Sequence, residues 1–500
     1  MADDTPRRRI PIFLILSLGV GGLLLFSVLF VLAYGATARP AGFDPATHTD
    51  YASKLREHAH ARLDDPLEAE AFYETVVRRM LDAVSSEDGA LLGADPSMLY
   101  MVPDIVTSDH DSYDQAGMRD APYFNEELYR ETERLLAETG TPELLALYDR
   151  MVDHPGSLRP IDDTTEPLMF TLLPELGPAR SLARVLAARA HLARKADDVP
   201  GMTVELERIL ALGRHLANNP TTLERLVAEA VTELALARLE VFLSHDTPSA
   251  EDLAGIAAAL ERQRGRPPIK YALTAERVSV EDFLQFIYTK DGVLVYSAFE
   301  DLGGNRVPLD LDDTRATLAL RLASQVEPMP WLANAACFFE PRLDQTRRVI
   351  DDAWAELDVA VRGEDFDPGV FDAITDSIVT SDAYLPTYTV RAVVQADLRY
   401  NAARLRVAIE RYRLDHGEPP PTLDDLVPGY LPEVPEAVAF DADRRFNYCN
   451  GPTEYADYPY VLSVDGPDKT PDGGRHNPCE DDWQDVPAGD DIVFNAPSCE

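Results

Sequence analysis

The stretch Ala408-Ile-Glu-Arg-Tyr-Arg-Leu-Asp-His-Gly417 ends a long helical pattern in this chain of 500 residues. Upstream of it, apolar side chains recur at spacings of three and four, which places them in one stripe along a helix. Gly417 suits the left-handed position that often follows the last helical residue. The stripe consists of Val390, Val394, Leu398, Ala402, Leu405, Ile409 and Tyr412.

Downstream of this helix the pattern changes to that of a small sheet. A proline-rich turn occupies 418–421, and Thr422–Val427 is typical of a short helix. The segments Arg445–Cys449 and Tyr458–Val464 have the period of two that predicts strands, and a loop rich in Asp and Gly follows them. We therefore expect residues 386–500 to form a small α+β module.

This predicted module resembles the soluble part of the major pseudopilins of type II secretion, over about a fifth of the chain. Similar modules end uncharacterised bacterial membrane-anchored proteins. The resemblance implies a calcium-binding globular part. The segments that carry it are 408–417, Tyr430-Leu-Pro432, Tyr460-Val-Leu-Ser-Val464, Asp465-Gly-Pro-Asp468, Asp472-Gly-Gly474 and Asp490-Asp-Ile-Val493.

The acidic loop of the module is the candidate metal site. Calcium takes six to eight oxygen ligands, and glycines let the chain fold tightly around the ion. The insertion Arg475–Gly489 departs from the family's pattern, and a solvated acidic loop without metal is the alternative. The resemblance implies Asp468, Asp472 and Asp491 as ligands, with Asp465 and Asp490 as further candidates.

The opposite end of the chain predicts a membrane anchor. Ile10–Tyr34 contains no charged residue, and roughly 1.5 Å per residue makes such a helix long enough to cross a bilayer. Arg7-Arg-Arg9 precedes it, so the positive-inside rule leaves residues 1–9 in the cytoplasm and exports the rest. A cleaved signal peptide ending near Ala36-Thr-Ala38 is the alternative. We expect a single-pass protein of a bacterial cytoplasmic membrane whose bulk is periplasmic.

Between the anchor and the module, residues 35–65 are typical of a linker and 66–385 of a helical domain. Short breakers containing Pro and Asn separate its helices, which favours an α-solenoid-like stack or an irregular bundle. The predicted fold class is therefore mostly α. The predicted helices of this domain include Leu67–Val84, Pro142–Val152, Ser181–Lys195, Val204–Ala217, Leu223–Leu243, Ala250–Arg262, Tyr271–Tyr288, Asp313–Val326, Leu343–Val361 and Asp367–Ser381.

Charge and cysteine content narrow the possible partners. The chain has 87 acidic and 46 basic side chains, so its surface repels phosphate backbones, and nucleic acid is not an expected partner.

Cys337 lies in an apolar run and is predicted to be a buried thiol. One disulfide among Cys449, Cys479 and Cys499 is expected outside the cytoplasm, and three pairings are open.

The sequence carries no familiar catalytic motif, so an enzyme is the less favoured interpretation. His58-Ala-His60 is expected to be a solvated pair, because residues two apart do not share a helix face. We expect a non-enzymatic scaffold that binds other envelope proteins, with a calcium-stabilised terminal module. The alternatives are an accessory component of a type II secretion or pilus-like system and an envelope hydrolase whose site lies in the helical domain.

Overall fold

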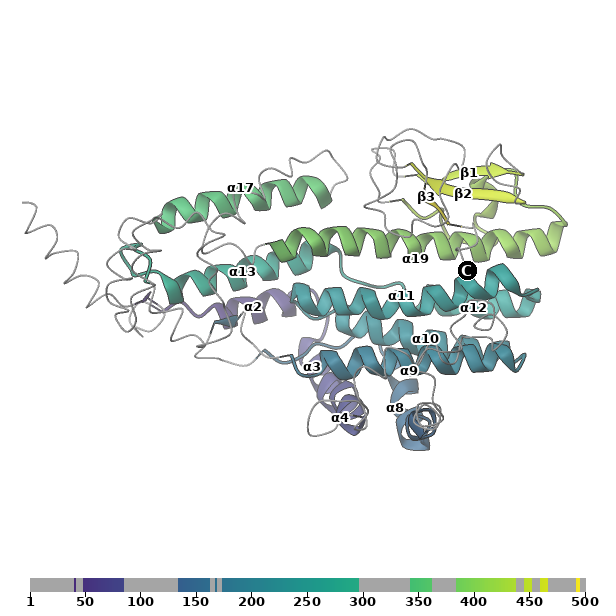
Figure 1. Cartoon of the computed structure of the whole chain (residues 1–500), viewed down its shortest axis with the longest axis horizontal. Coiled ribbons are helices and arrows are strands. Elements are labelled where there is room, and N and C mark those ends of the chain that lie inside the picture. Colours follow the sequence, from purple (N-terminus) through teal and green to yellow (C-terminus); the bar gives the residue numbers. More distant parts are fainter. Residues whose placement is uncertain are drawn as a thin grey trace, which may run out of the picture.

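The computed structural model describes residues 40–41, 48–84, 134–161, 167–168, 173–295, 342–361, 384–437, 445–451, 459–465 and 492–494. These ranges are mostly helical, as predicted, with a small antiparallel sheet near the C-terminal end (Figure 1). The predicted anchor Ile10–Tyr34 and the predicted helices Asp313–Val326 and Asp367–Ser381 lie outside them. Among the helices within these ranges, none is both long enough and apolar enough to cross a bilayer.

Four consecutive helices form the centre of the helical domain, and they confirm the four predicted there. The side chains of Asp198, Thr221 and Ser249 cap the second, third and fourth by accepting a backbone N–H of the first turn. Short connections make neighbouring helices antiparallel, so their apolar faces share one core. The helices are α9 (Leu176–Lys195), α10 (Val199–Ala217), α11 (Thr222–His245) and α12 (Ala250–Gln263).

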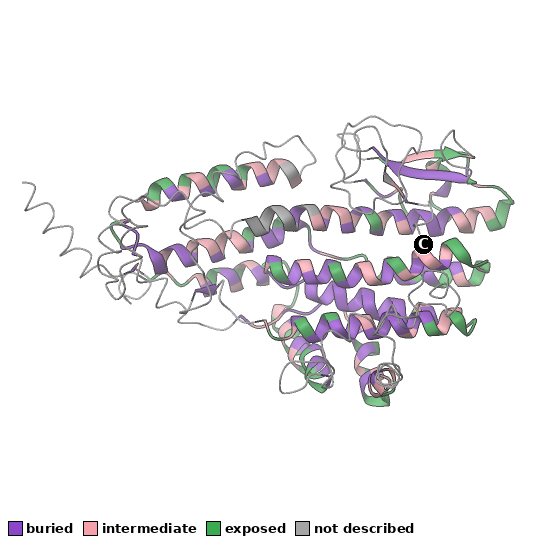
Figure 2. Cartoon of the chain, in the orientation of Figure 1, coloured by how far each residue is buried: buried purple, intermediate pink, exposed green. Residues whose placement is uncertain are grey.

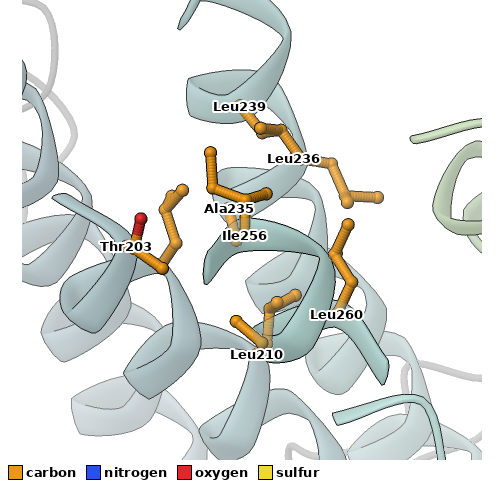
Figure 3. A pocket seen from close by; sticks show the side chains of 9 residues that line it. Thr203, Leu210, Ala235, Leu236, Leu239, Ile256 and Leu260 are labelled. Atoms are coloured by element: carbon orange, nitrogen blue, oxygen red, sulfur yellow. The ribbon is translucent and has the colours of Figure 1, made fainter. Parts of the chain in front are cut away.

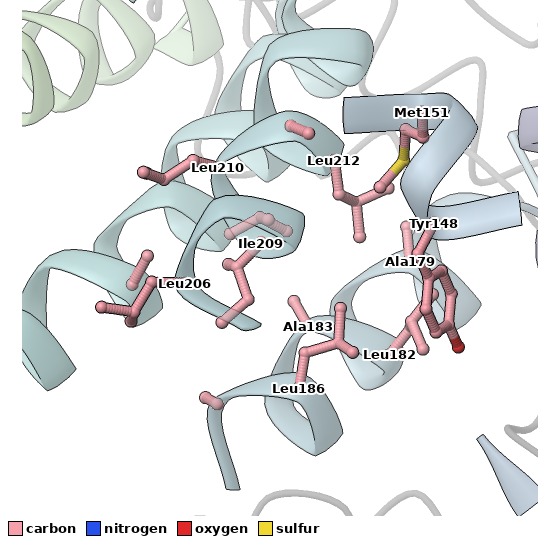
Figure 4. Packing of buried hydrophobic residues seen from close by; sticks show 14 of the residues in the cluster. Tyr148, Met151, Ala179, Leu182, Ala183, Leu186, Leu206, Ile209, Leu210 and Leu212 are labelled. Atoms are coloured by element: carbon pink, nitrogen blue, oxygen red, sulfur yellow. The ribbon is translucent and has the colours of Figure 1, made fainter. Parts of the chain in front are cut away.

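Helix α10 is the most enclosed of these four, and every residue from Glu205 to Ala217 is buried (Figure 2). Figure 4 shows Leu206 and Ile209 of α10 facing Leu186 of α9 in the main core. Burying each such side chain contributes about 1.5–3 kcal/mol. Because α10 is covered on all sides from Glu205 onward, the polar side chains of that part are buried as well.

Shorter helices cover one side of this core. The predicted helix Leu67–Val84 is confirmed as α3 (Pro66–Phe72), η2 (Tyr73–Arg78) and α4 (Arg79–Val84), in which η2 is a π-helix. Helix α8 (Pro142–Asp153) also agrees with its prediction. The region expected to be a linker, 35–65, contains a further helix, α2 (Tyr51–His60), whose buried Leu55 and Ala59 pack beside α13.

Helices α13 (Ile269–Ile287) and α17 (Leu343–Val361) extend the domain, and both agree with their predictions. Gly292 has φ 74°, a left-handed conformation that glycine adopts without steric cost, and it turns the chain after α13. Leu273 of α13 and Leu357 of α17 pack with Val393 in a second core.

Helix α19 (Tyr384–His416) is the long predicted helix, and Gly417 follows it with φ 85°. It runs between α11 and α12 on one side and the sheet on the other (Figure 1). From Leu398 onward the predicted apolar stripe packs into the module, whereas Val390 and Val394 join the second core. A second stripe, which was not predicted, runs along Val393, Ala396, Tyr400, Ala403 and Val407, and its last three residues join the main core.

The described part of the module contains three strands in the order β1-β2-β3, all antiparallel. The two predicted strands are confirmed as β1 (Asn447–Asn450) and β2 (Tyr460–Val464), and β3 (Ile492–Val493) was not predicted. The predicted short helix is the 3-10 turn η7 (Leu423–Leu426). Its Leu426 packs with side chains of the sheet against α19.

Candidate functional site

Asp465 is the one predicted calcium ligand that the described residues include. It directly follows β2 and is only 7% exposed. The side-chain amide of Asn447 in β1 donates a hydrogen bond to its Oδ1, with an Nδ2–Oδ1 distance of 2.5 Å. Its carboxylate is therefore held in place by the neighbouring strand. The other predicted ligands, Asp468, Asp472, Asp490 and Asp491, lie outside the described residues.

The pairing of β2 with β3 shows where the residues that border the acidic clusters in the sequence lie. Val464 of β2 pairs with Ile492 of β3. In the sequence, Asp465 follows Val464, and Asp490 and Asp491 precede Ile492. Val464 and Ile492, which border the two acidic clusters in the sequence, therefore lie at the same end of the β2–β3 pair. Within the described part of the chain, no three His, Cys, Asp or Glu side chains gather as a metal site requires.

Arg406 of α19 joins the module to the helical domain. Its Nη1 donates to the carbonyl oxygen of Phe494, next to β3, at 2.8 Å. Its Nη2 donates to the Ser244 hydroxyl of α11 at 3.3 Å, and the guanidinium lies 3.6 Å from the Glu240 carboxylate. The Tyr460 hydroxyl of β2 also hydrogen-bonds this side chain. Arg406 is 6% exposed and connects three elements that are distant in sequence.

Further ion pairs follow α19 along the same face. Arg399 pairs with Glu233 of α11 at 2.9 Å, and Arg404 with Glu261 of α12 at 2.5 Å. Asp397 lies 3.7 Å from Arg266. We call this set, together with the Arg406–Glu240 pair, the α19 seam. Charged side chains thus flank the apolar contacts of Tyr400 and Val407 with the main core.

The helical domain contains buried charges that link its helices. In α11, Glu229 lies 2.6 Å from Arg225 and 2.5 Å from Arg266. Burial raises the pKa of the Glu229 carboxyl, and the two guanidinium groups oppose that rise. Nearby, Arg159 lies 2.9 Å from Glu224 and 3.3 Å from Glu175. Each of these carboxylates faces an arginine, so the clusters serve packing between helices.

Arg214 and His215 of α10 hold the C-terminal end of α8. Arg214 Nη1 donates to the Pro155 carbonyl, and Nη2 reaches the Met151 carbonyl at 3.4 Å. His215 Nε2 donates to the same Met151 oxygen at 2.8 Å, and its Nδ1 accepts from Ser157 Oγ at 2.9 Å. Burial lowers the pKa of Arg214 to about 10 and that of His215 well below its usual value.

The histidines of α2 are not the solvated pair that the sequence predicted. His58 Nε2 donates to the Tyr271 carbonyl at 3.0 Å, and the two rings stack with centroids 4.9 Å apart. His60 Nε2 lies 2.7 Å from the Glu70 carboxylate. The prediction treated α2 as an isolated helix, but α13 and α3 provide a partner on each side. Both imidazoles therefore fix α2 onto the helical domain.

The hollows among the described residues include two of contrasting character. The first, between α10, α11 and α12, is almost wholly apolar and has a water-accessible volume of about 10 Å³ (Figure 3). Its one hydroxyl, Thr203, donates to the Val199 carbonyl. That space is about the size of one water and offers it no second polar partner. The second is an open hollow of about 500 Å³ beside Arg56 and His60 of α2.

Cys449 of β1 is exposed and forms no disulfide with another described residue. The cysteines considered as its partners, Cys479 and Cys499, lie outside the described residues, as does Cys337. The predicted disulfide therefore stays a prediction.

Comparison with protein-family models, with curated proteins and with solved structures gave no match for this chain.

Proposed function

We propose that this protein is a membrane-anchored, extracytoplasmic scaffold that presents a calcium-stabilised terminal module to other envelope proteins. The observation that carries this proposal is the position of α19. Its two apolar stripes belong to two cores, with Leu405 in the module and Val407 in the helical domain. A module attached in this way keeps one orientation on the domain, which suits presentation of a binding surface.

The charged side chains support a role in holding helices together. The seam on α19 and the arginine–glutamate clusters around Glu224 and Glu229 of α11 each join segments that are distant in sequence. Ion pairs of this kind are weak evidence for added stability, and we propose that they fix the orientation of the helices. The proposed scaffold therefore has a defined shape. A defined shape is required if several partners bind at once.

Calcium is proposed for the end of the module where β2 and β3 pair. Asp465 supports it, because this carboxylate is nearly buried and its orientation is fixed by Asn447. The Val464–Ile492 pairing supports it as well, since both acidic clusters begin at that strand end. Oxygen ligands of this type are those that calcium prefers. Bound calcium would relieve the repulsion among these carboxylates.

Melting of the full chain with calcium and with a chelator tests the metal. Ligand at 100 times its dissociation constant stabilises a protein by about 2.7 kcal/mol, which here raises the melting temperature by several degrees. Asp468→Asn and Asp491→Asn should abolish the rise. Asp424→Asn, an exposed aspartate of η7, is the matched control and should retain it. If the wild type has the same melting temperature in both buffers, calcium is removed from the proposal.

A reporter fused after residue 500 tests the location, since alkaline phosphatase is active only outside the cytoplasm. The proposal expects activity in the membrane fraction, and loss of the membrane association when residues 1–34 are removed. A cytoplasmic C-terminus would contradict it.

The order of elements in the module supports a second candidate, an accessory component of a type II secretion or pilus-like system. A long helix, a short turn and antiparallel strands follow one another from α19 to β2, as expected from the resemblance. Purification from detergent-solubilised membranes separates the two candidates. Secretion components that co-purify at fixed stoichiometry would favour the second.

A further inference from the structure

Phe72, His154 and His215 form an aromatic cluster where three elements meet. The His154 ring stacks on Phe72, the last residue of α3, with centroids 3.6 Å apart. His215 of α10 faces the same phenyl ring at 5.6 Å, and the two imidazoles lie 6.2 Å apart. Because His154 directly follows α8, the cluster fixes the end of α8 and the end of α3 to α10.

The hydrogen bonds of His215 leave no place for a second ring proton. Its Nδ1 accepts from the Ser157 hydroxyl at 2.9 Å, and its Nε2 donates to the Met151 carbonyl at 2.8 Å. A proton on Nδ1 turns that acceptor into a donor, and the buried Ser157 hydroxyl must then find another acceptor for its own proton. His154 is arranged alike, since its Nδ1 accepts from the Gly156 N–H at 3.3 Å.

The charges that act on His215 oppose its protonation. Arg214 is its neighbour in the chain, and His154 adds a second positive charge when it is protonated. Burial, and after it the charge of Arg214, holds the pKa of His215 well below its ordinary value. Further charged side chains near the cluster are Glu68 of α3 with His154, Glu224 of α11 and Glu175 at the start of α9 with Arg159, Arg150 of α8 over the Phe72 ring, and Arg62 after α2 with Asn218. Each of these carboxylates is thus held by another side chain.

We infer that the Phe72–His154–His215 cluster is a pH switch. Protonation of His215 in acid releases the end of α8 and residues 154–158 from α10, while α11 and α12 stay in place. The opened protein exposes Met151 and Phe72 of the main core, so acid changes the surface on this side of the helical domain. The switch goes beyond the proposed function, because it depends on neither the membrane anchor nor calcium.

Hydrogen exchange of the full chain at pH 7.5 and pH 5, corrected for the pH dependence of the intrinsic exchange rates, measures the release. A histidine that binds a proton only in the open form, with a pKa of about 6.5, favours opening by about 30-fold between these pH values. The protection factors of peptides covering 142–158 should therefore fall by about 30-fold in the wild type. Those of a peptide covering 250–263 of α12 should change much less.

Two variants assign the release to His215. In His215→Gln the amide can keep both hydrogen bonds but cannot take up a proton, so the fall in protection of residues 142–158 should largely disappear. His58→Gln is the matched control, because His58 also joins two helices, by donating to the Tyr271 carbonyl. It should retain the fall seen in the wild type.

Three results would overturn the inference. If the wild type protects residues 142–158 equally at both pH values, acid does not open α8. If the α12 peptide loses as much protection as residues 142–158, acid unfolds the whole domain and there is no switch. If His215→Gln responds as the wild type does, other groups open α8. The first two comparisons use the wild type alone, so they decide the question even where His215→Gln does not fold.

Discussion

Arg214 and His215 are adjacent on α10, yet both bind the end of another helix. The carbonyls at the C-terminus of α8 carry the negative end of its dipole, so a cation such as Arg214 is favourable there. His215 adds a neutral donor to the same Met151 oxygen. Arg214 donates its hydrogen bonds to uncharged acceptors, so burial lowers its pKa, and the nearby Tyr400 and Glu207 oppose this lowering only in part.

The buried neutral His215 makes stability depend on pH. The pKa of His215 in the folded protein lies well below that of an unfolded histidine, which is about 6.5. Below pH 6.5 this histidine therefore binds a proton in the unfolded chain but not in the folded protein. Its contribution is complete above pH 6.5 and is lost as the pH falls. Between pH 7.5 and pH 5, the unfolding free energy of His215→Gln should fall by about 2 kcal/mol less than that of the wild type.

Chemical denaturation at the two pH values checks this prediction. Ser157→Ala is the control, since it removes the hydroxyl that binds His215 Nδ1 and keeps the ring. It should lower stability by about 1 kcal/mol at both pH values and retain the pH dependence. An unchanged pH dependence in His215→Gln would mean that other groups cause it.

These residue-scale roles could not be predicted from sequence. Glu205, Glu207, Arg208, Arg214 and His215 give α10 the composition of a solvent-exposed helix. They are buried because α8, α9, α11 and α12 surround α10. Periodicity reports which side of a helix is apolar, but it does not report how many neighbours the helix has.

At the scale of elements, α10 and α11 lie close together at Gly213 of α10. A Cβ at Gly213 would lie 2.5 Å from Thr232 Oγ1 and 3.0 Å from the Ala228 carbonyl. The Thr232 hydroxyl already donates to that carbonyl, so it cannot move away freely. Gly213 is thus required by helix packing.

Substitution of two helical glycines by alanine tests this packing. Gly213→Ala should cost about 1–3 kcal/mol, because overpacking outweighs the gain in helix propensity. Gly255→Ala in α12 is the control: nothing lies within 4 Å of the added Cβ, and it should stabilise the protein by about 0.5–1 kcal/mol. Thermal unfolding followed by circular dichroism measures both. Stabilisation by both substitutions would show that the α10–α11 contact is looser than described.

The elements themselves were largely predictable where breakers mark their ends. Pro220 and Pro248 separate α10, α11 and α12 in the sequence as in the fold. The second stripe of α19 was missed because Arg399, Arg404 and Arg406 interleave with it and make that face look polar. Strand β3 has two residues, too few for a period to emerge. Of the candidate site, the sequence predicted the acidic residues, whereas the seam and Asn447 depend on long-range contacts.

At the scale of the whole molecule, α19 contributes side chains to the cores of both the module and the helical domain. We expect a single unfolding transition of the described structure. Leu405→Ala, in the module core, should cost about 2–5 kcal/mol, and Val407→Ala, in the main core, about 2 kcal/mol. Both substitutions should shift the same transition.

Calorimetry of the full chain and circular dichroism at 222 nm check the single transition. Leu414→Ala, on the same helix but 42% exposed, is the control and should change stability by less than about 0.5 kcal/mol. Two separated transitions, with Leu405→Ala moving one and Val407→Ala the other, would contradict a shared unit.

The place of α19 in the chain has a consequence for synthesis and export. Tyr400 and Val407 complete a core whose other members lie between residues 72 and 260. More than a hundred residues separate α12 from Tyr400. The apolar surface of α11 and α12 that contacts α19 therefore stays exposed to water until the last fifth of the chain has been synthesised. Contacts so distant in sequence form late and leave apolar surface open to aggregation. A nascent chain halted before residue 400 should therefore be a substrate for chaperones and proteases.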